Sequence, residues 1–173
     1  VYQYIFDYPK ALGFYQKTLA INEQTGNTTG ITNALGNIAN IQNELRDYPK
    51  AIEYYERAKA YSERTGNLQS LSGILVNLGN VYTQLADYPK ALEYKQQALE
   101  ISEKSGNKAR IANNLSNIGN VYSQLADYPR ALEYQQKALE INESIQDKSG
   151  IAANWAGIGK VYLYQKQYAA AAA

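Results

Sequence analysis

The chain has 173 residues, of which 17 are basic and 16 acidic, so its net charge is +1. No block of like charge stands out, and we expect no nucleic-acid partner. The sequence contains neither Cys nor His, which removes thiolate ligands and the commonest general base; we therefore expect no metal, no cofactor and no catalytic residue. No apolar run reaches the roughly 20 residues of a membrane helix, so no membrane partner is expected either. A cytoplasmic location suits this composition.

One tetrapeptide contains every proline of the chain and recurs every 40 residues. It reads Asp-Tyr-Pro-Lys at 7–10, 47–50 and 87–90, and Asp-Tyr-Pro-Arg at 127–130. Segments 81–103 and 121–143 are identical at 18 of 23 positions. The chain is therefore built from internal repeats, and its fold is read one repeat at a time.

Each repeat contains two helical patterns. In the first-type helix, apolar residues recur at steps of four and three along one face; in one copy they are Ile111, Leu115, Ile118, Tyr122 and Leu125. In the second-type helix, Asp127 can cap the N-terminus, and Pro129 is tolerated in the first turn. Three second-type helices are followed by glycines that fit a left-handed helix end, namely Gly26, Gly66 and Gly106.

In chain order, we expect second-type helices at 8–25, 48–65, 88–105 and 128–146, and first-type helices at 28–45, 68–85, 108–125 and 149–166. Residues 1–6 would end a first-type helix, and a further second-type helix would begin at Tyr168. One array over 1–173 would hold full repeats at 28–66, 68–106 and 108–147, with partial repeats at 1–25 and 149–173. Ala169–Ala173 break the repeat pattern, and we derive no chemistry from them. No strand pattern competes, so the fold class is all-α.

Small and aromatic residues occupy fixed positions of the helix pair. Two repeats share a set of glycine, tyrosine and two alanines: Gly79, Tyr82, Ala91 and Ala98, then Gly119, Tyr122, Ala131 and Ala138. This set resembles the tetratricopeptide repeat. Trp155 matches the aromatic opening position of that family, where the other repeats have Leu35, Leu75 and Leu115.

The period of 40 exceeds the family's usual length of about 34 residues. It is similar to the arrays of kinesin light chain, of Pins-type polarity scaffolds and of bacterial proteins. The resemblance implies a right-handed superhelical solenoid of antiparallel helix pairs, in which first-type helices line a concave groove that binds extended peptides.

Amide side chains share one face of the first-type helices, roughly opposite the apolar face. We call this set the asparagine stripe; it comprises Asn33, Asn37, Asn40, Asn77, Asn80, Gln84, Asn113, Asn117, Asn120 and Gln124. Solvent-exposed helix positions usually favour Glu, Lys and Arg, because Asn is a weaker helix former. No charged residue occurs between Leu68 and Ala86, or between Ile111 and Ala126. The stripe is therefore a neutral surface that can pair with the backbone of an extended peptide.

Two other interpretations of the stripe stay open. Asparagines of adjacent helices could bond one another and fix the stacking of the repeats, or duplication could have copied residues that have no role. Lys160 and Tyr164 replace Asn and Gln in the last first-type helix, either to bind a carboxylate or a ring or because a terminal repeat has drifted. Tyr82, Tyr122 and Tyr162 fall on the apolar face, and we expect them to pack in the core.

We therefore expect a protein–protein interaction module, not an enzyme, that binds a peptide or partner segment on the stripe, as part of a larger signalling or scaffold protein. The alternative is a structural spacer or self-assembly element without a peptide ligand. Partial repeats at both ends would leave apolar surfaces that associate head to tail.

Overall fold

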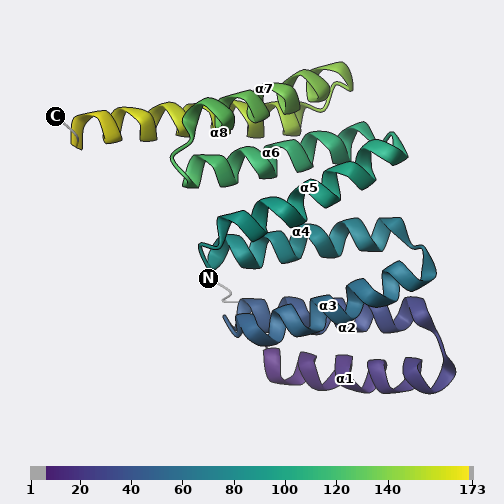
Figure 1. Cartoon of the computed structure of the whole chain (residues 1–173). Helices are drawn as coiled ribbons and strands as arrows, with labels where there is room; N and C mark the ends of the chain where they lie inside the picture. The colour runs from purple at the N-terminus through teal and green to yellow at the C-terminus, as the bar shows by residue number, and fades with distance from the viewer. Residues whose placement is uncertain (1–6, 172–173) are drawn as a thin grey trace, which may run out of the picture. The chain divides into compact units, whose positions relative to one another are not determined.

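The computed structural model describes the backbone of residues 7–171 and the side chains of residues 7–166. Within this range it has eight helices and no strand, which confirms the all-α fold (Figure 1). The helices are α1 (Tyr8–Thr25), α2 (Thr28–Glu44), α3 (Tyr48–Thr65), α4 (Leu68–Gln84), α5 (Tyr88–Ser105), α6 (Lys108–Gln124), α7 (Tyr128–Ser144) and α8 (Lys148–Ala171). Even-numbered helices are of the first type and odd-numbered helices of the second. The helix expected at 1–6 lies outside the described residues.

The chain divides into two compact units, Val1–Val81 and Tyr82–Ala173. In the first unit, α1 packs against α2, and α2 packs against α3. In the second unit, α5 packs against α6, α6 against α7, and both α6 and α7 contact α8. Each unit is thus a solenoid of stacked helices, while one continuous array over the whole chain stays a prediction.

Every second-type helix begins at an aspartate cap with proline in the first turn. The Asp127 carboxylate accepts a hydrogen bond from the backbone N–H of Arg130 at 3.2 Å, and Asp7, Asp47 and Asp87 make the same contact three residues on. These bonds satisfy one of the N–H groups that a helix start leaves without a partner. The tetrapeptide repeat therefore sets the helix starts, as predicted.

Helix ends fall into two groups. Gly26, Gly66 and Gly106 adopt φ of 67°, 66° and 67° after α1, α3 and α5, as predicted. Left-handed residues that are not glycine occur in the other turns, at Arg46, Ala86, Ala126 and Gln146. The fourth second-type helix was expected to reach residue 146, but α7 ends at Ser144, because Gln146 takes the left-handed position.

The core of the second unit follows the predicted apolar face. Leu115 and Ile118 are buried, and the Tyr122 ring stacks on the Tyr134 ring with centroids 5.4 Å apart. A Cβ on Gly119 would lie 3.2 Å from the carbonyl oxygen of Ala131. The glycine therefore lets α6 and α7 approach closely, which explains why glycine and alanine recur together. Leu125, predicted on the same face, is 42% exposed because it lies just beyond the end of α6.

The end of the chain departs from the prediction. No new helix begins at Tyr168, because α8 continues to Ala171; this segment lacks the Asp-Tyr-Pro sequence that starts every other second-type helix. Among the described residues, no following helix covers α8, so Trp155 is 56% exposed and Tyr162 is 58% exposed. The prediction that Tyr162 packs in the core is wrong for this reason. The side chains of Ala169–Ala173 lie outside the described residues.

Candidate functional site

The asparagine stripe lies at the surface of α2, α4 and α6. Asn33, Asn40, Asn80, Gln84, Asn113, Asn120 and Gln124 are exposed, and Asn37, Asn77 and Asn117 are half-buried. This exposure agrees with the predicted face opposite the core. Stripe residues of α2 and α4 come together within the first unit.

A hollow of about 320 Å³ in the first unit is lined by residues of α2 and α4 and by Tyr55 of α3. Its lining consists of Thr32, Asn33, Gly36, Asn37, Asn40, Tyr55, Gln69, Ser70, Gly73, Ile74 and Asn77. Four of these residues belong to the stripe, and none is charged. The hollow is therefore a neutral surface rich in hydrogen-bonding groups.

Some stripe asparagines bond neighbouring helices. The Asn40 side-chain oxygen accepts hydrogen bonds from the Tyr55 hydroxyl at 2.5 Å and from the Asn77 amide at 3.4 Å. Tyr55 is 2% exposed, and burial, assisted by the charge of Glu44, raises its pKa to about 12. In the second unit, the Gln135 amide donates to the Asn120 oxygen at 2.9 Å. Asn40 and Asn77 thus bond each other between repeats, as the inter-helix interpretation expects, whereas Asn120 bonds a glutamine of α7.

Other stripe asparagines make no such bond. Among the described residues, the side chains of Asn33, Asn37, Asn113 and Asn117 have no hydrogen-bond partner. Their amides can both donate and accept; Asn33 and Asn113 are exposed, and Asn37 and Asn117 are half-buried. The stripe therefore combines asparagines that hold helices together with asparagines whose bonding capacity is available to a ligand.

A buried polar network in the second unit was missed by the sequence analysis. Asn154 of α8 is 1% exposed; its amide donates to Ser116 at 2.6 Å and to Gln135 at 3.0 Å, and its oxygen accepts from Asn142 at 2.7 Å. Asn114 likewise donates to Ser102 at 2.8 Å. Aligning the repeats would have located this network, because asparagine here occupies the position of the buried residue Ile74.

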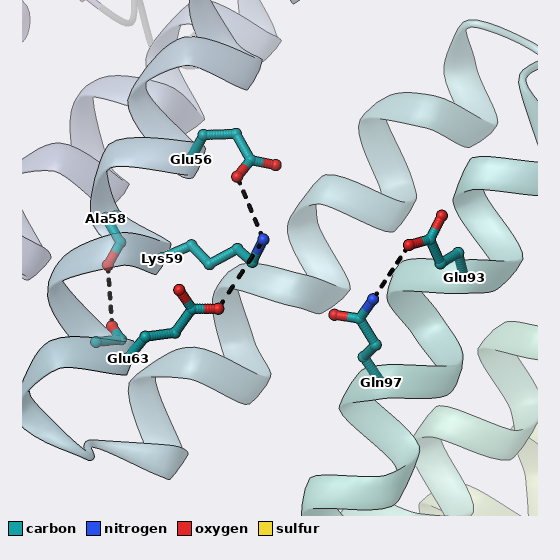
Figure 2. Close-up of polar contacts among 7 residues, drawn as sticks. Glu56, Ala58, Lys59, Glu63, Glu93 and Gln97 are labelled. Carbon is teal, nitrogen blue, oxygen red and sulfur yellow. Dashed lines mark hydrogen bonds and ion pairs between the residues drawn. The ribbon is translucent and has the colours of Figure 1, made fainter.

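Charged residues concentrate on second-type helices, and Figure 2 shows two of their contacts with neighbouring side chains. Lys59 of α3 lies between Glu56 and Glu63, at 3.4 Å and 3.9 Å, and Gln97 of α5 donates to Glu93 at 3.3 Å. On α8, the Lys160 amine lies over the Tyr164 ring, 5.5 Å from its centroid, so these two residues contact each other. The neutral stripe and the charged surface thus belong to different helix types.

Lys95 of α5 is the exception among these charged residues, because its side chain is buried. It corresponds to Tyr55 and Gln135 in the flanking repeats, is 3% exposed, and burial lowers its pKa to about 8. A buried lysine was not expected here, because charged side chains are rarely fully buried.

Neither a metal site nor a membrane span occurs in the part of the chain that the structure describes. No group of three or more carboxylates there could hold a metal ion. Over the same residues, no helix is both long and apolar enough to cross a bilayer.

The helix pairs and their close glycine–alanine contacts define a helical-repeat protein. The sequence profile described as Tetratricopeptide repeat matches residues 1–65, 70–144 and 111–173. The chain therefore belongs to the tetratricopeptide repeat family, and so to a class of protein–protein interaction scaffolds that are typically not catalytic. Among curated proteins, none matches the sequence.

Several solved structures share this fold. BtubC (BKLC) from P. vanneervenii has a TM-score of 0.79 at 19% identity, over 92% of this chain and 67% of that one. The apo form of RapI has a TM-score of 0.82 at 20% identity, over 95% of this chain and 46% of that one. A putative kinesin light chain of Podosopora anserina has a TM-score of 0.76 at 15% identity, over 92% and 80%. The chain thus spans less than half the length of RapI.

Proposed function

We propose that the chain binds an extended, uncharged segment of a partner protein along the asparagine stripe. The observation that carries this proposal is the hollow of the first unit, which four stripe asparagines line and no charged residue enters. Membership of an interaction family supports the proposal, and so does the unused bonding capacity of Asn33 and Asn37.

Asparagine amides suit this task because each can pair with both the N–H and the C=O of an extended backbone. Each such bond contributes about 0.5–1.5 kcal/mol net. Six to eight bonds, less the cost of ordering the peptide, correspond to affinity of about micromolar. Charged peptide side chains would lose water over the stripe without gaining a counter-charge.

A displayed library of random peptides tests the proposal. The parent chain should enrich peptides with few charges, and the Asn33→Ala/Asn37→Ala variant should lose that enrichment while it keeps its melting temperature. Gln16→Ala/Gln96→Ala is the matched control, because it removes two exposed amides from second-type helices. Equal enrichment by the parent and the asparagine variant would contradict the proposal.

Self-association is the second candidate function, and the exposed face of α8 favours it. Trp155, Tyr162 and Leu163 are all more than half exposed there. A Cβ on Gly159 would meet nothing within 4 Å, whereas one on Gly119 would meet Ala131. Helix α1 of a second copy, with Ala11 at the position of Ala131, would supply the missing close contact.

Light scattering after size exclusion tests this second candidate. A mass that rises with protein concentration, and that falls to the monomer value in Trp155→Ser/Tyr162→Ser, would support it. A monomer at every concentration would refute it. Phe14→Ser is the control for losing an exposed apolar side chain, because Phe14 is 66% exposed on α1.

A further inference from the structure

We infer that the hollow of the first unit is a side-chain pocket that selects a carboxamide, Gln or Asn, from the bound segment. This inference rests on the proposed function, because it names what one part of the stripe recognises. The hollow measures about 320 Å³, which lies at the small end of the range for ligand sites, about 300–1,000 Å³. It therefore has room for one side chain and its adjoining backbone.

Two glycines leave the hollow open. Gly36 of α2 and Gly73 of α4 both line it, and a Cβ at either position would meet no atom within 4 Å. Glycine inside a helix costs about 1 kcal/mol relative to alanine, and neither glycine is required here by a close helix contact. Positions 40 residues further on carry Val76 and Asn113, so the same helices form with side chains at these places.

Some side chains of the lining already make hydrogen bonds within the protein, and others do not. The Thr32 hydroxyl donates to the Thr28 carbonyl at 3.0 Å, and the Tyr55 hydroxyl and the Asn77 amide both donate to Asn40. The side chains of Asn33 and Asn37 have no hydrogen-bond partner among the described residues. Both kinds of group, donor and acceptor, are therefore available at the pocket.

This lining discriminates among side chains. A charged side chain would be desolvated without a counter-charge, because no lining residue is charged. An aliphatic side chain would cover the amides of Asn33 and Asn37 and leave them without water or a partner. A carboxamide both donates and accepts, so it can pair with an asparagine amide on the wall. The chemistry thus favours Gln or Asn.

The test fills the pocket with residues that the chain itself carries at corresponding positions. Gly36→Val/Gly73→Asn should fold with an equal or higher melting temperature, since helix glycines are removed and no Cβ is obstructed. Gly13→Ala is the matched control, because a Cβ on this glycine of α1 also meets nothing within 4 Å and Gly13 lies outside the hollow.

The parent, the filled variant and the control are each used to select from the same displayed library of random peptides. The parent and Gly13→Ala should enrich peptides with Gln or Asn at one fixed position, and the filled variant should lose this preference at least tenfold. Enrichment of another residue there, or an unchanged preference in the filled variant, would overturn the pocket while leaving peptide binding intact. If the parent enriches no peptide, the proposed function fails and the pocket with it.

Discussion

The side-chain oxygen of Asn40 in α2 lies 3.4 Å from the amide nitrogen of Asn77 in α4, 37 positions later. This contact joins two repeats within the asparagine stripe, at the edge of the hollow. Asn40 also accepts the Tyr55 hydroxyl. Asn40 therefore has a structural role, whereas the proposed ligand-binding role falls on other asparagines, so mutation can test the two roles separately.

Asn40→Ala should lower the free energy of unfolding by about 1–3 kcal/mol, because the buried Tyr55 hydroxyl would lose its acceptor. Denaturant unfolding measures this loss. A cycle with Tyr55→Phe provides the control, since removing both groups should cost less than the sum of the single changes. Strictly additive costs would mean that this hydrogen bond contributes nothing.

Lys95→Gln should stabilise the chain by up to about 3 kcal/mol at neutral pH, because a pKa lowered from 10.5 to about 8 means that burial disfavours the charged amine. Glutamine already occupies the corresponding position at Gln135, which is 2% exposed. Denaturant unfolding at pH 7 checks the sign; a less stable variant would contradict the expectation.

The same lysine makes the folding stability of the chain depend on pH. Between about pH 8 and 10.5 the unfolded chain holds the Lys95 proton and the folded chain does not, so this group makes stability rise with pH. The advantage of Lys95→Gln should therefore be full below pH 8 and shrink towards pH 10.5. Because both proteins contain the same tyrosines, comparing them at each pH cancels the contribution of tyrosine ionisation, including that of Tyr55, to stability. A constant advantage would show that burial does not shift this lysine.

Gly150→Ala should destabilise the second unit by about 1–3 kcal/mol, because the new Cβ would lie 2.5 Å from the buried Asn142 amide and 2.7 Å from the Asp147 carboxylate. Another repeat has the smaller Ser62 at the position of Asn142, and there a side chain, Ser70, occupies the position of Gly150. Asn142→Ser should therefore rescue Gly150→Ala, and thermal unfolding of the single and double variants measures the rescue. A double variant no more stable than Gly150→Ala would disprove this size complementarity.

Ala86→Gly should stabilise by about 1 kcal/mol, because Ala86 has φ of 57° and a left-handed residue costs least as glycine. Ala60→Gly, at an exposed position inside α3, is the matched control and should destabilise by about the same amount. Chemical unfolding distinguishes the two; destabilisation by both changes would show that the turn carries no strain.

Much of the fold was predictable because the sequence marks its helix ends. The second-type helices at 8–25, 48–65 and 88–105 agree with α1, α3 and α5, since aspartate caps and glycine stops act locally. The predictions at α7 and α8 were less accurate, where Gln146 replaces a glycine and no Asp-Tyr-Pro follows.

The site was less predictable than the helices. Periodicity placed the stripe on one surface, but it could not show that Asn40 bonds Tyr55 or that Gly36 and Gly73 leave a hollow. Those relationships depend on which side chains of neighbouring helices meet. The buried Asn154 was missed because asparagine is read as a surface residue, although its alignment with Ile74 marks a core position.

The most direct test of the central claim is the affinity of one selected peptide for the parent and for Asn33→Ala/Asn37→Ala, measured by fluorescence anisotropy beside the melting temperature. Loss of two or three amide bonds should weaken binding by about tenfold or more, at about 1 kcal/mol each. The melting temperature should stay equal or rise, because alanine is the better helix former. Unchanged affinity in a folded variant would contradict peptide binding on the asparagine stripe.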